Sequence, residues 1–354
     1  TTGDATTGDA TGDPWDTSGG DTWDTDGEPI PEMCAGYYVD GPPEFGDGCG
    51  GGYGQAIGAP EVKDEMCCFT VDWPEICCGR PFSVGEGARV AAVAATRAWL
   101  GERLPTPQLG GLDAATRERL AAAWTADGLA EHASVASFAR FILELLAVGA
   151  PAELVSAAQR ALAEEIEHAR LCFALASAYR GAPVGPGPLA IDAALDGGGD
   201  LRSIVARALV EGCIGETLAA LQAGVAAAST GDPAVAAALQ SIADDELEHA
   251  ALAWSFVRWA IDAGGLADAE GLIAAAIDAA EAEARAPIEV SADAEGDALA
   301  VYGRLDAGAE QRLRRDGART VILPALRGLA ADLAARRGAT SVRAAALRSA
   351  AARA

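Results

Sequence analysis

Two short motifs contain two of the three histidines in this chain. The segments EIEH, residues 165–168, and ELEH, residues 246–249, each place a glutamate three positions before a histidine. On a helix, residues three apart share a face, so Glu165 with His168, and Glu246 with His249, can bind one ion each. Mixed carboxylate and imidazole ligands suit iron or manganese, whereas zinc and copper prefer softer ligands. The motifs therefore predict two metal-binding helix faces.

The two motifs belong to a longer repeat. Glu131 precedes Glu165 by 34 residues, and Glu211 precedes Glu246 by 35 residues. A single Glu-x-x-His motif on an acidic helix is weak evidence, whereas its repetition with a matching upstream glutamate predicts two equivalent halves. The predicted ligand set combines four glutamates and two histidines: Glu131, Glu165, His168, Glu211, Glu246 and His249.

Apolar stripes surround these predicted ligands. Ala161 and Cys172, for example, lie one turn to either side of the EIEH motif. Several carboxylates in one apolar core are costly unless cations neutralise them, and two divalent metal ions would do so. The alternative interpretation, charges on solvated helix faces, suits Glu167 and Glu248 but fits the six predicted ligands poorly.

The pattern resembles the ferritin-like superfamily of di-iron carboxylate proteins, which includes bacterioferritins, rubrerythrins and di-iron oxygenases. In that arrangement two helices each give one glutamate, and two others each give a Glu-x-x-His motif. The resemblance covers about residues 112–263 and implies two bound metal ions, iron first and manganese second. It also implies dioxygen or peroxide as a reaction partner, together with a reductant or small substrate that the sequence does not identify.

Residues beside the predicted ligands suggest how the histidines are held. Glu164 and Asp245 directly precede the two motif glutamates, and metal-bound histidines usually donate their second N–H to a carboxylate. By symmetry we expect Asp245 to bind His168 and Glu164 to bind His249. The alternative is that both acids are half-exposed helix charges, and the sequence favours neither.

The helix that carries Glu211 also contains Gly212, Gly215 and Glu216. The two glycines leave room either for dioxygen or a small substrate, or for close helix packing. Glu216 lies five positions after Glu211, so we expect it to lie off the ligand face. Rubrerythrins carry an extra carboxylate closer in sequence, so this spacing disfavours a rubrerythrin-type peroxidase.

Alanine, leucine, arginine and glutamate at helical spacing predict an all-α fold. Four long helices are expected near residues 114–148, 152–180, 200–229 and 233–263. The first and third connections are tight turns, whereas residues 181–200 form a long, proline-rich connection. This short, long, short pattern predicts a four-helix bundle with one crossover, which is the ferritin-like topology.

Helices are also expected outside this bundle. A lead-in helix is predicted at 86–104, and further helices at 266–286, at 306–337 with an interruption at Pro324, and at 341–353. The predicted organisation is an acidic low-complexity tether (1–30), a Cys-rich disulfide module (31–82), the lead-in helix (83–111), the di-metal bundle (112–264) and accessory C-terminal helices (265–354).

The N-terminal segments predict an exported protein. Residues 1–48 contain twelve acidic residues and no Lys or Arg, and six cysteines fall within residues 34–78. Three disulfides are the favoured interpretation, with a zinc site as the alternative. Together with a first residue, Thr1, that suits a processed chain, these features predict a secreted, periplasmic or cell-surface bacterial protein. The N-terminal segment is expected to act as a tether to the membrane or cell surface.

Charge and hydropathy exclude two classes of partner. A net charge of −26 argues against nucleic-acid binding, and no apolar stretch reaches the roughly 18 residues of a membrane span. The expected function is an exported di-metal oxidase, oxygenase or ferroxidase that activates dioxygen or peroxide. The alternatives are an iron-storage protein, or a surface binding protein whose metal site is structural. The sequence is also compatible with a homodimer.

Overall fold

The computed structural model describes most of the chain after residue 79. It describes residues 80, 82–84, 87–101, 105–196, 199–263, 266, 268–288 and 299–351, with side chains up to 337, and the backbone of short strands within 44–72. The predicted acidic tether and the predicted disulfides of the Cys-rich module lie outside the described residues. Two compact units are formed by residues 1–45 with 54–73, and by 46–53 with 74–354.

Short strands are the regular elements described before residue 80. Strands β1 (Glu44–Gly46), β2 (Tyr53–Ala56) and β5 (Val71–Asp72) form one sheet in the order β1-β2-β5. Strands β3 (Glu61–Lys63) and β4 (Met66–Cys68) form an antiparallel pair in which Val62 lies opposite Cys67. The N-terminal segment therefore contains β-structure, whereas the rest of the described chain is mostly helical.

Four long helical segments contain the residues of interest. They are α1 (Ala114–Ala147), α2 (Ala152–Arg180), a continuous segment of α3 (Leu201–Arg207), π-helical η2 (Ala208–Glu216) and α4 (Thr217–Ser229), and α5 (Pro233–Asp262). These bounds agree with the predicted helices to within one residue.

Local sequence explains where these helices begin and end. The side chains of Asp113, Asp200 and Asp232 each accept a hydrogen bond from a backbone N–H in the first turn of α1, α3 and α5. Such caps satisfy N–H groups that have no partner within the helix. Gly181 ends α2 with a φ of 75°, a conformation that glycine adopts without strain.

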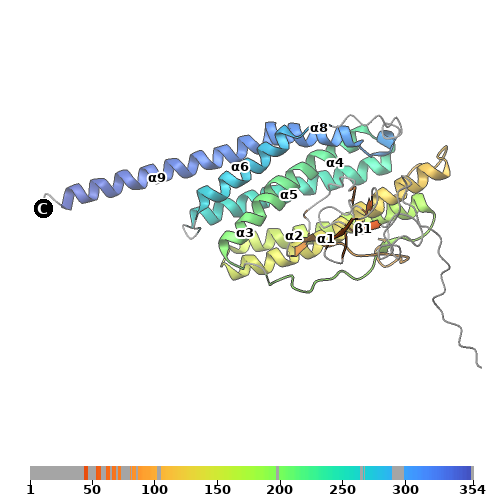
Figure 1. The fold of residues 1–354 in the computed structure, drawn as a ribbon, viewed down its shortest axis with the longest axis horizontal. Coiled ribbons are helices and arrows are strands. Elements are labelled where there is room, and N and C mark those ends of the chain that lie inside the picture. Colours follow the sequence, from red (N-terminus) through yellow and green to blue (C-terminus); the bar gives the residue numbers. More distant parts are fainter. Residues whose placement is uncertain are drawn as a thin grey trace, which may run out of the picture. The chain divides into compact units, whose positions relative to one another are not determined.

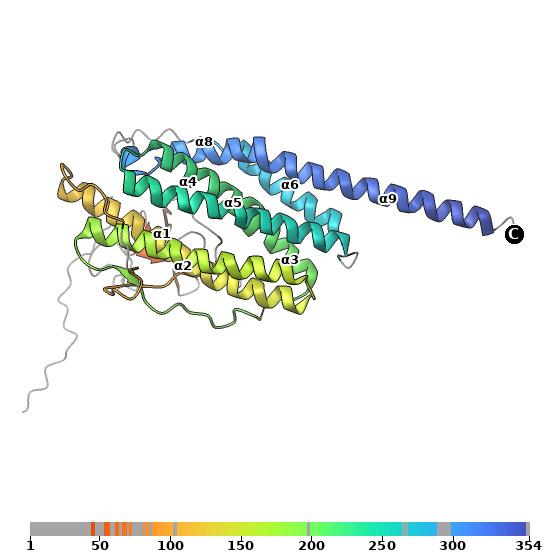
Figure 2. The same cartoon turned by 180° about the vertical axis from the view of Figure 1, so that it is seen from behind.

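The long segments pack in pairs (Figures 1 and 2). Helix α1 lies along α2, η2 and α4 lie along α5, and α2 contacts α5. Two hydrophobic clusters fill the space between them. One contains Phe138, Leu145 and Phe256, and the other contains Trp124 and Tyr179. Along α1, α2 and α5, the stretch between these clusters carries the predicted ligands, so the site lies in the middle of the core.

The predicted lead-in helix at 86–104 is wrong for the residues described there. This region contains strands β6 (Ser83–Val84), β7 (Gly87–Ala88) and β8 (Val93–Ala94). Strand β8 pairs with β9 (Gly185–Pro186) in the α2–α3 connection, and Arg89 donates to the backbone carbonyls of Ala190 and Asp192. These tertiary contacts override the weak helix preference of the local sequence.

The C-terminal region is helical as predicted, but its interruptions differ. It contains α6 (Ala269–Arg285), η3 (Ala300–Tyr302), α8 (Ala307–Gly317), π-helical η4 (Ala318–Ile322) and α9 (Leu323–Ala351). The predicted break at Pro324 is wrong, because the chain stays helical across it. Pro324 has no backbone N–H and so cannot donate the hydrogen bond of a regular helix. The π-helical segment η4, which ends two residues earlier, changes the hydrogen-bond pattern at this point. The predicted separate helix at 341–353 belongs to α9.

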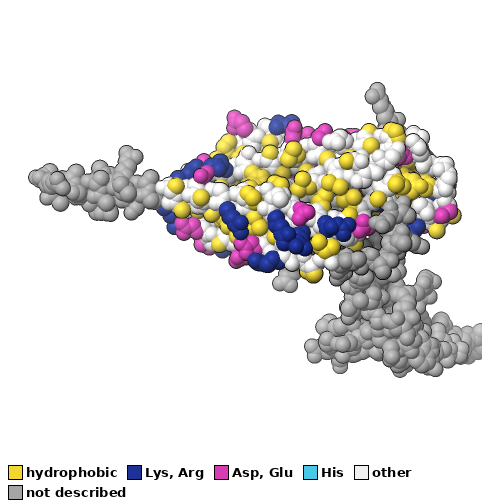
Figure 3. Space-filling model, turned by 90° about the horizontal axis from the view of Figure 1, so that it is seen from above, with side chains coloured by type: hydrophobic (Ala, Val, Ile, Leu, Met, Phe, Trp, Pro, Cys, Tyr) yellow, Lys and Arg dark blue, Asp and Glu magenta, His cyan; other side chains and the backbone are white. Residues whose placement is uncertain are grey.

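Arginines of the C-terminal helices pair with acids on neighbouring helices. Arg327 bonds Glu281 at 2.9 Å, and Arg336 pairs with Asp262. Figure 3 shows basic and acidic side chains lying next to one another on this face, among apolar ones. Arg327 and Arg336 therefore form solvated ion pairs. Within the described part of the chain, every helix is too short or too polar to span a bilayer.

Candidate metal centre

Four helical segments bring acidic and imidazole side chains together in the core. Each of these residues is at most 1% exposed to solvent. They form two groups that could each hold a metal ion, and the ligand atoms of each group lie within 4.8 Å of one another. The first group is Glu131, Glu165, His168 and Glu246; the second is Glu165, Glu216, Glu246 and His249.

Glu165 and Glu246 belong to both groups. Nδ1 of His168 lies 3.7 Å from Oε2 of Glu165 and 3.9 Å from Oε1 of Glu246. Nδ1 of His249 lies 3.2 Å from Oε1 of Glu165 and 3.6 Å from Oε2 of Glu246. Each of the two central glutamates thus turns one oxygen toward each histidine. This is the arrangement needed to bridge two ions.

Glu131 and Glu216 each belong to one group, Glu131 to that of His168 and Glu216 to that of His249. Oε2 of Glu131 lies 3.7 Å from Nδ1 of His168. Glu216 groups with His249 at the other end. The two imidazole rings have their centroids 5.9 Å apart, so the cluster is elongated, with one histidine toward each end.

Carboxylates outside the cluster hold both histidines. Nε2 of His168 donates to Oδ2 of Asp245 at 3.0 Å, and Nε2 of His249 donates to Oε2 of Glu164 at 2.9 Å. These hydrogen bonds join the residue pairs that the sequence predicts. Both acids are also about one-third exposed, as the alternative interpretation expected. Because Nε2 donates in each of these bonds, Nδ1 is the nitrogen that would bind a metal ion.

The donor atoms of this cluster lack hydrogen-bond partners among the described residues. Both carboxylate oxygens of Glu131, Glu165, Glu216 and Glu246, and Nδ1 of His168 and His249, are buried without such a bond. Buried polar atoms without partners are expensive, and buried unpaired charges more so. Divalent cations would coordinate these atoms and offset their charge. The residues present therefore fit a metal centre.

Without a bound cation, burial and neighbouring charges shift the pKa values of these side chains strongly. It raises the pKa of Glu131, with a further contribution from the charge of Glu165, and it raises the pKa of Glu216. Burial alone would lower the pKa of His249, but Glu164 and Glu165 outweigh it and raise the value to about 12. The pKa of His168 is also raised, since Asp245 and Glu131 outweigh burial. Without metal, the cluster retains protons that metal ions would replace.

The prediction that Glu211 joins this cluster is wrong, and Glu216 takes its place. Oε2 of Glu211 lies 3.6 Å from Nη2 of Arg140, away from both groups. Burial raises the pKa of Glu211, and the nearby positive charges of Arg80 and Arg140 oppose that rise. The expectation that Glu216 lies off the ligand face is likewise wrong.

The π-helical segment η2 explains this difference. Residues 208–216 form a π-helix, in which hydrogen bonds connect positions five apart instead of four. The prediction assumed regular α-helical spacing through this stretch, so it placed Glu211 inward and Glu216 off the face. Glu211 and Glu216 are the only acidic residues in 201–229, and Gly212 and Gly215 lie between them. Two glycines between two candidate acids were the available sequence signal.

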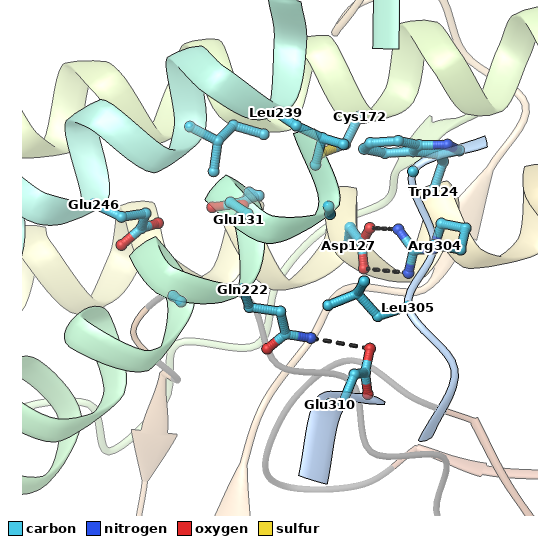
Figure 4. A pocket seen from close by; sticks show the side chains of 15 residues that line it. Trp124, Asp127, Glu131, Cys172, Gln222, Leu239, Glu246, Arg304, Leu305 and Glu310 are labelled. Carbon is cyan, nitrogen blue, oxygen red and sulfur yellow. Dashed lines mark hydrogen bonds and ion pairs between the residues drawn. The ribbon is translucent and has the colours of Figure 1, made fainter. Parts of the chain in front are cut away.

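A small cavity reaches the Glu131 end of the cluster (Figure 4). Its volume is about 40 Å³, and its lining includes Glu131, Glu246, Cys172 and Leu239. A cavity of this size holds only a few molecules as small as water. The cavity is therefore large enough to hold very small molecules beside the cluster.

Two polar contacts lie at the far side of this cavity in Figure 4. Arg304 forms a two-pronged ion pair with Asp127, and Gln222 donates to Oε1 of Glu310 at 3.0 Å. Arg304 and Glu310 come from the segment after η3, so the C-terminal region helps to enclose the cavity. The lining also includes small residues of α4, such as Ala223.

Comparisons with known protein families, with curated proteins and with solved structures gave no match. The structure by itself shows a mostly helical protein with a buried group of glutamates and histidines that could hold a metal ion.

Proposed function

We propose that this chain is a ferritin-like four-helix-bundle protein that binds two metal ions, iron or manganese. One ion would be held by Glu131 and His168, the other by Glu216 and His249, with the remaining two glutamates shared. The observation that carries this proposal is that two groups of buried donor atoms share Glu165 and Glu246, and these atoms have no other described hydrogen-bond partner.

We further propose that the centre reacts with dioxygen or peroxide, as an exported oxidase, oxygenase or ferroxidase. A pair of ferrous ions would supply the two electrons that such a reaction needs. The chain's own residues contribute the surroundings. Asp245 and Glu164 fix the two imidazoles, the hydrophobic clusters on either side exclude bulk water, and the cavity beside Glu131 admits small molecules.

Rapid mixing with oxygen tests this activity. Protein loaded with ferrous iron in the absence of oxygen is mixed with oxygenated buffer, and near-ultraviolet absorbance follows iron oxidation. We expect oxidation of two irons per chain, much faster than for iron in buffer alone. Glu246→Gln should abolish this rate, whereas Glu248→Gln, a change on the exposed face of the same helix, should preserve it.

Two other results would point elsewhere. Iron that binds but oxidises no faster than in buffer would favour a structural metal site. Uptake of many irons per chain would favour storage.

A further inference from the structure

An arginine from outside the four long helical segments reaches the Glu216 end of the cluster. Arg80 is only 2% exposed, and its Nε lies 3.3 Å from Oε1 of Glu216. Its guanidinium carbon lies 4.5 Å from the centre of the Phe138 ring and 4.8 Å from that of Phe141. Arginine stays protonated at all physiological pH values. A permanent positive charge is therefore buried beside one glutamate of the cluster.

The fold holds this arginine in place. The hydroxyl of Ser134 on α1 donates to the backbone carbonyl of Arg80 at 2.8 Å. Gly212 of η2 leaves the space that the guanidinium occupies, since a Cβ there would lie 2.6 Å from Nη2 of Arg80 and 2.4 Å from Cβ of Ala253. Close packing, one of the two explanations open for this glycine, thus accounts for Gly212.

The other end of the cluster is arranged differently. Glu131 forms an ion pair with His168 and borders the cavity. The arginine of that cavity, Arg304, forms its two-pronged ion pair with Asp127, one turn before Glu131. The two ends of an otherwise symmetric cluster therefore differ in their surroundings.

We infer that Arg80 makes the two metal positions unequal, so that the position at Glu216 and His249 binds a divalent cation more weakly than the position at Glu131 and His168. A fixed cation competes for the lone pairs of Glu216 and repels a second cation nearby. Arg80 is a positioning residue that acts through Glu216. This inference rests on the proposed two-metal centre.

Calorimetric titration of the metal-free full chain with Mn²⁺ tests the inference. We expect two binding steps of one ion each, whose dissociation constants differ at least tenfold. Arg80→Met keeps an unbranched side chain beside the two phenylalanine rings but removes the guanidinium group and its charge. It should tighten the weaker step about tenfold or more, equivalent to about 1.4 kcal/mol, and leave the stronger step unchanged. Arg80→Lys, which keeps the charge, should retain the wild-type difference.

A matched control is Arg140→Met. Arg140 is also buried, at 7% exposure, but it pairs with Glu144 and Glu211 outside the cluster. Its replacement should leave both steps unchanged. Equal tightening by the two substitutions would show a general effect of charge and overturn the specific role of Arg80.

The order of the two positions can be tested without changing Arg80. Glu131→Gln should remove the tighter step, and Glu216→Gln the weaker step. The opposite assignment, or equal steps in the wild-type chain, would overturn the inference while leaving a two-metal centre intact. Absence of Mn²⁺ binding by the wild-type chain would instead refute the proposed centre itself.

Discussion

At the residue scale, the cluster combines groups that the sequence identifies with one that it does not. Five of the six predicted ligands meet in the core, because Glu-x-x-His spacing on a regular helix places both side chains on one face. For Glu164 and Asp245 the sequence left two interpretations open, and the structure shows both the hydrogen bonds to the histidines and the partial exposure. The involvement of Arg80 was not predictable, because it depends on where a distant segment folds.

The hydrogen bond from His168 to Asp245 should strengthen metal binding. Asp245 fixes the ring and increases the basicity of Nδ1, so Asp245→Ala should weaken metal affinity about 10- to 100-fold. Competition with a chelator of known affinity measures this change. Glu248→Gln, on the exposed face three residues further along α5, is the control and should bind like the wild-type chain. Equal affinities of the Asp245→Ala and wild-type proteins would show that this bond is incidental.

At the element scale, helix boundaries were predictable from residue spacing and the turns between helices, whereas departures from α-helical geometry were not. Asp113, Asp200 and Asp232 mark three helix starts, and Gly181 marks an end. The π-helical segments η2 and η4 depend on packing around them, so a period of 3.6 residues misplaces the side chains that follow. Strand β8 likewise depends on its partner β9 in the α2–α3 connection, a contact that local propensity does not contain, whereas β6 and β7 pair with each other.

Because η2 is π-helical, substitutions of Glu211 and Glu216 should have different effects on metal binding. Glu216→Gln should reduce the number of tightly bound ions from two to one per chain, because it removes a donor from one end. Glu211→Gln should leave two ions, because Glu211 contacts Arg140 outside the cluster. Metal analysis after desalting measures both. Loss of an ion in the Glu211 variant but not in the Glu216 variant would mean that the helix is regular here.

The cavity between α1, α4 and α5 should control the reaction with oxygen. Ala223→Phe would fill the space beside Glu131, so we expect oxidation of the loaded protein to slow at least tenfold while two ions still bind. The control, Val225→Phe, changes a residue on the same helix that is 43% exposed. Rapid mixing with oxygen measures both rates. An unchanged rate in the Ala223 variant would place the entry route elsewhere.

At the scale of the whole molecule, the cluster lies between two hydrophobic clusters that together form the centre of the core. An apolar core stabilises the helices, but four carboxylates and two imidazoles inside it oppose folding unless their charge is compensated. Stability should therefore depend on metal far more than in a protein whose site lies at the surface.

Removal of metal should lower the melting temperature substantially. At a free ion concentration 1,000 times the dissociation constant, binding stabilises the folded state by about 4 kcal/mol. For a helical unit of this size, that corresponds to roughly 10 °C. Calorimetry with and without Mn²⁺ measures the shift. Glu246→Gln should respond little to Mn²⁺, because it removes a donor that both groups share. An identical response in both proteins would contradict this account.

Anomalous X-ray diffraction from crystals of the Mn²⁺-loaded protein would locate the ions themselves. We expect two anomalous peaks inside the helical core, one beside Glu131 and His168 and the other beside Glu216 and His249. Glu165 and Glu246 should contact both peaks. A map without peaks at this position, or with these glutamates directed into solvent, would contradict the proposed two-metal centre.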